Sequence, residues 1–410
     1  MPRAFAVLVL ARCVNRLGGF SMAFLGVHLG TALGASLAVV GVVLAAFGLA
    51  TIPSRLLGGY LAGRFGAVPT MVAGLVGCAA AQLVLAAAPT LGWALVGAVL
   101  LGLAFEVVEP PSQALVADLV DPADLPSAYA LLWSVLAVAG VAAGGIAAVV
   151  VRAGIAWLFV VDAVTCLACA LLVALLLRAP AAGAEASEPT GRGPMLAAAR
   201  DRGLLRHTAR GTVFATAYMV VVFALPLSVE ALRLGPSTTG VLLAVEAAAA
   251  LAAQPLVRRV RDRVRADATA LRLGYGVVAG GLVVAGLAVG SVGSLGTPGL
   301  EAVVVLGVGL SVVAVGSTLT LGPLQAGAAR LAPAWGRAAH LAVFGLAWGV
   351  ATTVAPGVVS TLLPHGVAWP WVAAAVLVVA LAALPARDEP VPGAPTPSGM
   401  TTTTPARATR

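Results

Sequence analysis

Two pairs of charged residues lie inside long apolar stretches of this sequence. Arg12 and Arg16 are four residues apart, and Glu106 and Glu109 are three apart, so each pair would share one face of a helix. An ionisable side chain at the centre of a lipid bilayer costs roughly 2.5–3.5 kcal/mol on insertion scales. These residues are therefore candidates for handling protons or a charged substrate. The alternative is that the four charges only neutralise one another.

Three further polar residues lie in similar surroundings. Asn15 is next to the arginine pair, and Glu246 lies midway along another apolar stretch, with no obvious basic partner at that depth. Glu246 is either a second protonation site or a residue that faces an aqueous vestibule. Asp162 lies near the end of its apolar stretch, and we expect it to have a structural role.

The elements that carry these charges must be membrane-spanning helices. The chain has 410 residues, of which 60% are hydrophobic and 10% are charged, whereas roughly a quarter of the residues in a soluble domain are charged. A span needs roughly 20 apolar residues. The apolar stretches predict twelve spans, at residues 4–29, 37–61, 70–88, 91–116, 128–151, 155–177, 208–232, 238–257, 270–289, 300–321, 338–363 and 368–384.

Residue usage excludes several other classes of protein. All 24 basic residues are arginine, so the chain has no lysine for a phosphate-binding P-loop or for a Schiff base. The four histidines are far apart, and the four cysteines fall inside apolar stretches, which indicates small buried residues rather than disulfides. We therefore expect no metal site, no cofactor and no enzymatic activity.

The arginines also predict the orientation of the chain. If the N-terminus is cytoplasmic and the spans alternate, nearly all loop arginines fall on the cytoplasmic side, and Arg152 and Arg233 fall outside. Because cytoplasmic loops carry the basic residues of membrane proteins, we expect a multi-pass protein of the plasma (inner) membrane with both termini inside. The net charge of +8 then reflects topology and contact with the lipid bilayer, and no nucleic acid partner is expected.

The chain divides into two similar halves. Residues 33–36 (Leu-Gly-Ala-Ser) return as residues 234–237 (Leu-Gly-Pro-Ser), and a Gly-Val pair follows each a few residues later. A stretch rich in proline, glycine and polar residues separates the halves, and a Pro/Thr-rich stretch ends the chain. We predict an N-terminal six-helix half, a cytoplasmic linker, a C-terminal six-helix half and a disordered cytoplasmic tail, at residues 1–178, 179–206, 207–386 and 387–410.

A glycine-rich turn between the second and third spans carries a recognisable motif. It reads Gly59-Tyr-Leu-Ala-Gly-Arg64-Phe-Gly66 and resembles the Gly-x-Leu-Ala-Asp-Arg-x-Gly loop of the major facilitator superfamily. The usual aspartate is Gly63 here, and the basic pair that normally follows is missing. Asp118, at the end of the fourth span, either pairs with Arg64 in place of that aspartate or is an ordinary solvated residue.

Other stretches resemble the drug:proton antiporter (multidrug efflux) group of that superfamily. Residues 111–122 resemble the end of helix four in that group, and residues 159–163 resemble its Phe-x-x-Asp-Ala in helix six. Gly140 and Gly144 fall where the antiporters have Gly-x-x-x-Gly-Pro, with Gly145 in place of the proline. The resemblance implies an all-α membrane fold of twelve helices in two pseudo-symmetric halves. It also implies that helices one, four, seven and ten line a cavity, with the arginine and glutamate pairs opposite each other.

The function that the resemblance implies is secondary active transport, by a monomer. We expect proton-coupled export of a drug-like compound or secondary metabolite, so the partners are a small-molecule substrate and protons. Two alternatives remain: uptake or facilitated exchange of a small metabolite, and a transporter-like membrane partner or sensor that transports nothing.

Glu106 and Glu109 are the expected proton-coupling site. Their spacing separates them by about 4.5 Å along a helix axis, so in a poorly hydrated cavity the two carboxylates should resist being ionised together. Arg12 or Arg16 would stabilise the ionised partner, and a cationic substrate would expel the proton. Otherwise the two glutamates only balance the arginines.

Overall fold

The structure, a computed structural model, describes residues 2–120, 125–177, 192–264, 267–295, 300–331 and 337–384. Over these residues the chain is almost entirely helical, and eleven helical segments are long and apolar enough to cross a membrane. A shorter apolar helix, α15 (Trp369–Ala383), follows them. The expected all-α membrane architecture is confirmed, and with α15 the helix count agrees with twelve.

The helices of the two halves follow one another with short connections. The first half contains α1 (Arg3–Gly18), α2 (Ser21–Leu33), α3 (Leu37–Phe65), α4 (Ala67–Ala86), α5 (Leu91–Phe105), the 3-10 turn η1 (Glu106–Val108), α6 (Glu109–Leu119), α7 (Leu125–Val150), the turn η2 (Val151–Ala153) and α8 (Ala156–Leu176). After α9 (Arg192–Arg200), the second half contains α10 (Arg202–Ala231), α11 (Pro236–Arg263), α12 (Asp267–Leu295), α13 (Leu300–Leu331), α14 (Arg337–Leu362), the turn η4 (Leu363–His365) and α15.

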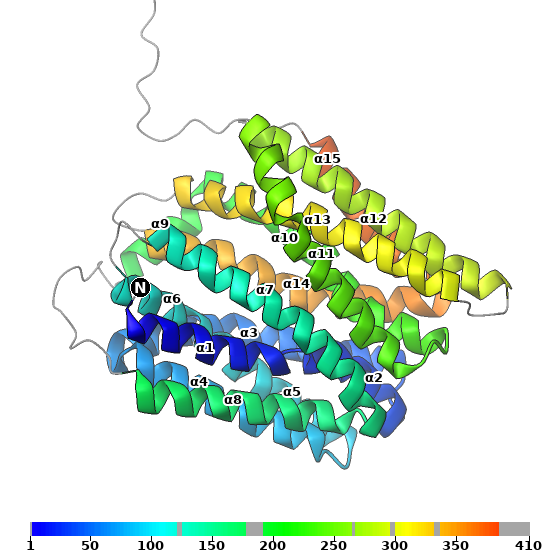
Figure 1. The fold of residues 1–410 in the computed structure, drawn as a ribbon, viewed down its shortest axis with the longest axis horizontal. Helices are drawn as coiled ribbons and strands as arrows, with labels where there is room; N and C mark the ends of the chain where they lie inside the picture. Colours follow the sequence, from blue (N-terminus) through cyan, green and yellow to red (C-terminus); the bar gives the residue numbers. More distant parts are fainter. Residues whose placement is uncertain are drawn as a thin grey trace, which may run out of the picture.

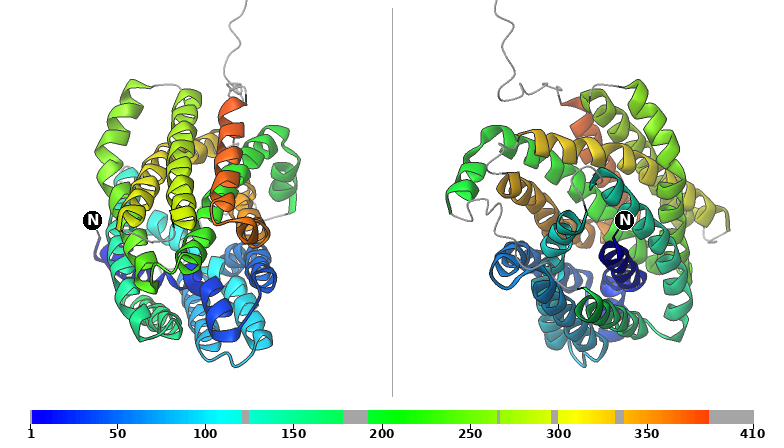
Figure 2. Two further views of the ribbon diagram at one scale, coloured as in Figure 1. Left: turned by 90° about the vertical axis from the view of Figure 1, so that its right-hand side faces the viewer. Right: turned by 60° about the vertical axis from the view of Figure 1, so that its left-hand side comes forward.

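Because successive spans alternate in direction, the connections gather at two ends of the bundle. The N-terminus and α9 lie at the same end (Figure 1), which we call the linker end. The turns before α3, α8, α11 and α15 lie at the opposite end, which we call the far end. Figure 2 shows the first half, in blue to teal, below the second half, in green to red.

Matching turns at the far end show the internal repeat. Gly34 (φ +65°) precedes α3, and Gly235 (φ +85°) precedes α11. Gly154 (φ +127°) precedes α8, Gly366 (φ +144°) precedes α15, and each faces the ring of the tryptophan three residues later. A positive φ favours glycine, so a glycine with positive φ occurs just before the corresponding helix in each half, although ψ differs between Gly34 (23°) and Gly235 (142°).

The first span is broken into two helices, whereas the sequence predicts one continuous span. α1 ends at Gly18 and α2 begins at Ser21. A Cβ on Gly18 would lie 2.1 Å from Oγ1 of Thr165 and 2.7 Å from Cα of Asp162. The end of α1 can approach α8 this closely because residue 18 has no side chain.

The fourth span is interrupted, as its two prolines predict, but the irregular turn comes before them. α5 ends at Phe105, η1 covers the next three residues, and Pro110 and Pro111 occupy the first turn of α6. The N–H groups of the first turn have no partner within the helix, so the prolines, which have no N–H, cost no helical hydrogen bond there. The backbone N–H of Glu106 donates instead to Oγ of Ser54 on α3, at 3.1 Å.

Two helix pairs, α7 with α11 and α3 with α14, join the halves. A Cβ on Gly144 or Gly240 would lie within 2.5 Å of a backbone nitrogen of the partner helix. A Cβ on Gly48 would lie within 2.5 Å of the backbone of Thr352 and the next residue. Small residues at these positions let the helix backbones touch.

Part of the expected flexible linker is helical. α9 packs on α14 and α10, and its Ala198 is fully buried. Asp201 caps α10 by accepting hydrogen bonds from the N–H groups of Gly203 and Leu204, at 2.8 and 3.1 Å. Residues 178–191 and the predicted tail lie outside the described residues.

Candidate functional site

Arg12 and Glu109 form an ion pair inside the first half. Nη2 of Arg12 donates to Oε2 of Glu109 at 2.7 Å, and Gln113 donates to the other carboxylate oxygen at 2.9 Å. The two charged side chains are 14% and 26% exposed. Charge-assisted hydrogen bonds of this kind are strong, so the loss of either partner would leave a poorly solvated charge.

Glu106 pairs with Arg55 of α3, a partner that the sequence analysis did not identify. Nη1 of Arg55 donates to Oε2 of Glu106 at 3.0 Å. The guanidinium lies against Gly345 of α14, where an added Cβ would lie 2.7 Å from Cζ of Arg55. This second ion pair therefore lies where the halves meet. An arginine inside an apolar stretch is the available sequence signal, since a charge at that depth requires a partner.

The predicted opposition of the arginine pair and the glutamate pair holds for Arg12 alone. Arg16 is exposed, and its guanidinium lies beside Gly140 of α7, whose Cβ would be 3.8 Å from Nε. Arg16 is also close enough to interact electrostatically with Tyr218 and Glu246 of the second half. It forms no ion pair within the part of the chain that the structure describes.

Glu246 therefore has a basic neighbour, contrary to the expectation from its position in the sequence. Oη of Tyr218 donates to Oε1 of Glu246 at 3.5 Å, and the tyrosine ring packs edge-on against Trp348, with 5.9 Å between ring centroids. Helices α1, α10, α11 and α14 bring Arg16, Tyr218, Glu246 and Trp348 together. We call these four residues the inter-half site.

Asn15 lies apart from both ion pairs and belongs to a network around Asp162. Its amide donates to Sγ of Cys166 at 3.2 Å, and Cys166 in turn donates to Asp162 at 3.6 Å. Ser21 and Gln82 donate to Oδ2 of Asp162 at 2.5 and 2.6 Å. Asp162 is 6% exposed. The network connects the break between α1 and α2 to α4 and α8, which agrees with a structural role.

The residues of the loop motif have separate environments. Gly66 (φ +91°) makes the turn between α3 and α4. Nη1 of Arg64 donates to Oη of Tyr60 at 3.1 Å. A Cβ on Gly59 would meet nothing within 4 Å, so this glycine is not required for close packing. Asp118 belongs to α6, but its side chain lies outside the described part of the structure, so its pairing with Arg64 stays a prediction.

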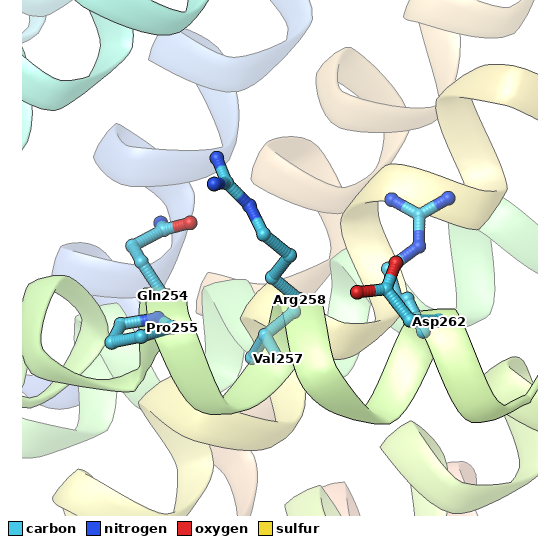
Figure 3. A pocket seen from close by; sticks show the side chains of 6 residues that line it. Gln254, Pro255, Val257, Arg258 and Asp262 are labelled. Carbon is cyan, nitrogen blue, oxygen red and sulfur yellow. The ribbon is translucent and has the colours of Figure 1, made fainter.

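A cavity of about 620 Å³ lies away from the ion pairs, at the linker end of α11. It is lined by Gln254, Pro255, Val257, Arg258, Arg261 and Asp262. Gln254 and Arg258, one turn apart, extend from the same face of the helix (Figure 3). This cavity begins about 12 Å along the helix from Glu246. Its polar lining fits an aqueous vestibule at the linker end.

The comparison with protein families decides the class of the chain. The model described as "Major Facilitator Superfamily" matches residues 8–326, which is more than half of the sequence. The chain belongs to the major facilitator superfamily. Membership in this family of transporters makes the protein a multi-pass transporter rather than an enzyme. No curated protein sequence matches the chain.

Solved structures of other transporters have the same fold. The nucleoside transporter NupG has a TM-score of 0.77 at 13% identity, and the match covers 93% of this chain and 98% of NupG. A POT family transporter in complex with 5-aminolevulinic acid has a TM-score of 0.76 at 12% identity, with 93% and 95% covered. The xylose transporter XylE from E. coli, in a partially occluded inward open conformation, has a TM-score of 0.68 at 15% identity, with 93% and 98% covered. At such low identity the similarity shows the fold alone.

Proposed function

We propose that this transporter is a proton-coupled exporter of a drug-like compound or secondary metabolite. It acts as a monomer in the plasma membrane, with both termini cytoplasmic. The observation that carries the proposal is the arrangement at η1: Glu106 and Glu109 are bonded to two different arginines. One of these arginines, Arg55, also lies against Gly345 of the other half. Transport by this fold requires the halves to move relative to each other around a site between them.

Protonation of Glu106 connects the proton to that movement. A proton on the carboxylate removes the negative charge that attracts the guanidinium of Arg55, so the interaction between the two side chains weakens. The guanidinium then loses its fixed position against Gly345, and the contact between α3 and α14 changes. Glu109 stays bound to Arg12, so one of the two carboxylates responds to the proton while the other keeps α1 in place.

The orientation follows from the arginines at the linker end. Arg64, Arg258 and Arg261 all lie near that end, and basic residues mark the cytoplasmic side. Single cysteines in a chain whose native cysteines are replaced provide the test. Ala199→Cys on α9 should be labelled by an impermeant maleimide only after the cells are permeabilised, whereas Ala153→Cys at the far end should be labelled in intact cells. The reverse pattern contradicts the orientation.

Proton coupling is tested by Glu106→Gln and Glu109→Gln in proteoliposomes. Fluorescent drug-like compounds of different charge serve as probes, and Glu301→Gln at the start of α13 is the matched control for a glutamate outside the site. We expect the parent and the control to drive dye efflux with a pH gradient. At least one of the site variants should lose gradient-driven efflux while keeping downhill exchange. If both site variants pump like the parent, the two glutamates are not the coupling site.

The same assay separates the alternative functions. Exchange that does not depend on the pH gradient in the parent would favour uptake or facilitated exchange of a small metabolite. No transport of any probe by a correctly folded parent would favour a membrane partner or sensor.

A further inference from the structure

We propose that the inter-half site binds a zwitterion, a small molecule that carries both an anionic group and an amine. The proposal rests on the transport function above and names the substrate class for it. Its starting point is a difference between Arg16 and the other arginines near the middle of the bundle. Arg12 and Arg55 each form an ion pair with a glutamate, whereas Arg16 forms no ion pair within the described residues.

One charge of each sign therefore remains unpaired where the halves meet. Arg16 comes from α1 and Glu246 from α11, and they interact electrostatically without forming an ion pair. The guanidinium of Arg16 lies beside Gly140 of α7, whose Cβ would also lie 3.7 Å from Cβ of Ala247, the residue after Glu246 in α11. The two opposite charges are thus near each other without a direct contact. Arg16 is exposed and Glu246 is half-buried, so both charges are accessible, and a ligand that supplies both counter-charges is stabilised at both ends.

The donors and acceptors on each side fit different groups. The planar guanidinium of Arg16 matches a carboxylate or phosphate, which it can bind through two parallel hydrogen bonds. On the other side, Glu246 and the hydroxyl of Tyr218 offer oxygen atoms for an ammonium group. Trp348, which packs edge-on with Tyr218, adds an aromatic ring that attracts cations.

Space beside the guanidinium is left by a glycine. Gly140 lies next to Arg16, and a Cβ there would be 3.8 Å from Nε and 3.7 Å from Cβ of Ala247 on the opposite half. The absence of a side chain at this position leaves the space of about one methyl group beside the guanidinium, between α7 and α11.

A ligand with one charge fits less well than a ligand with two. A simple cation meets Glu246 but is repelled by Arg16, and a simple anion meets Arg16 but is repelled by Glu246. Like charges a few ångströms apart repel each other even where water has access. A zwitterion satisfies both residues and leaves the net charge of the site unchanged.

Two matched sets of probes test the charge preference on the full-length protein in detergent. The first set is 5-aminolevulinic acid, its methyl ester as the cation and levulinic acid as the anion. The second set is phenylalanine, phenethylamine as the cation and 3-phenylpropionate as the anion. A ligand that binds the folded state raises the unfolding midpoint. We expect the zwitterion of at least one set to raise it more than its two singly charged analogues. If neither zwitterion does so, the proposal is wrong.

Substitutions then test the two residues separately. Arg16→Gln should weaken zwitterion binding by about tenfold or more and shift the preference toward the cation of the set. Glu246→Gln should weaken it similarly and shift the preference toward the anion. Arg152→Gln, at the far end, is the control and should bind like the parent. Equal weakening of all three probes by both site variants would contradict the assignment of one charge to each residue.

Glu106→Gln separates this proposal from the proposed proton coupling. The variant should bind the zwitterion like the parent even if it no longer pumps, because Glu106 pairs with Arg55 outside the inter-half site. Size-exclusion profiles and the midpoint without probe show whether each variant is folded. If Arg16→Gln does not fold, Arg16→Lys, which keeps the charge but not the planar fork, should weaken binding of the anionic group.

Discussion

The interiors of the two halves differ in the polar side chains that connect their helices. In the first half, polar side chains connect the helices: Arg12 with Glu109, Arg55 with Glu106, and the donors around Asp162. In the second half, α12 and α13 meet backbone to backbone, as a Cβ on Gly281 would lie 2.7 Å from the carbonyl oxygen of Gly309.

Because of this difference, the two halves should respond differently to protonation. The backbone contact at Gly281 contains no group that a proton could change, and the ion pair that joins α12 to α13, Arg330 with Asp267, is largely exposed. Protonation should therefore affect the α12–α13 packing less than the contacts of the first half. The ion pairs of the first half change strength when a carboxylate gains a proton. We infer that the first half responds to the proton and that the second half is a rigid body against which it moves.

The largest effect is expected from a side chain placed in the α12–α13 contact. Gly281→Leu would force side-chain atoms into the backbone of α13, which cannot move aside as a side chain can, so the cost should exceed the roughly 1–3 kcal/mol of ordinary overpacking. Gly280→Leu is the matched control, because a Cβ there meets nothing within 4 Å. Gly281→Leu should lose its monodisperse size-exclusion peak, and Gly280→Leu should keep it. Equal yields would show that the contact tolerates a side chain.

Breaking an ion pair in the first half should have the next largest effect. Removal of one partner of a buried pair costs 3–5 kcal/mol in soluble proteins. Because this pair is partly exposed, we expect about 2–3 kcal/mol for Arg12→Ala. Arg330→Ala, which breaks the exposed pair with Asp267, should cost less than about 1 kcal/mol. Chemical unfolding in detergent measures both. Similar losses would mean that burial does not distinguish the pairs.

A side chain at Gly345 should affect the contact between the halves more than the stability of either half. Gly345→Val would push Arg55 away from Glu106, and a strain of about 1.4 kcal/mol corresponds to tenfold in an equilibrium constant. We expect gradient-driven efflux to fall by about tenfold. Gly357→Val on the same helix, with open space at its Cβ, should transport normally. Normal efflux by Gly345→Val would exclude the proposed link.

The smallest effect is expected from a neutral hydrogen bond in the second half. Nε1 of Trp371 donates to Oγ of Ser228 at 3.2 Å, and both residues are fully buried. Ser228→Ala should cost about 1 kcal/mol, as for a typical neutral bond. Thr361→Ala, which removes an exposed bond to its own helix, should change the unfolding free energy much less. A larger loss for Thr361→Ala would contradict the burial argument.

The fold could be predicted because its main determinants are local. Each span needs only a sufficient run of apolar residues, and turns such as those at Gly34 and Gly235 repeat the same residues in both halves. The sequence analysis did not predict the break after Gly18, although Gly18-Gly19 is a local signal for one. The close approach of Gly18 to Thr165 joins residues that are distant in the sequence.

The site could be predicted only in part, because several of its contacts join residues that are distant in the sequence. The free-energy cost of placing a charge within a membrane span identified Arg12, Glu106 and Glu109 as residues with a special role. The partner of Glu106 is 51 residues away in the sequence, on another helix. The proximity of Arg16 and Glu246 depends on how the two halves dock, which no local pattern contains.

The glycine contacts between the halves also determine how well the protein insulates the membrane. At Gly48, Gly144 and Gly240 one backbone touches another, so these contacts leave no space for an ionisable side chain that could relay a proton. Each charge that crosses a membrane releases about 2.3 kcal/mol per 100 mV. Many inactive copies of a transporter that leaked protons would dissipate the membrane potential. These tight contacts let inactive copies of the transporter stay in the membrane without dissipating the membrane potential.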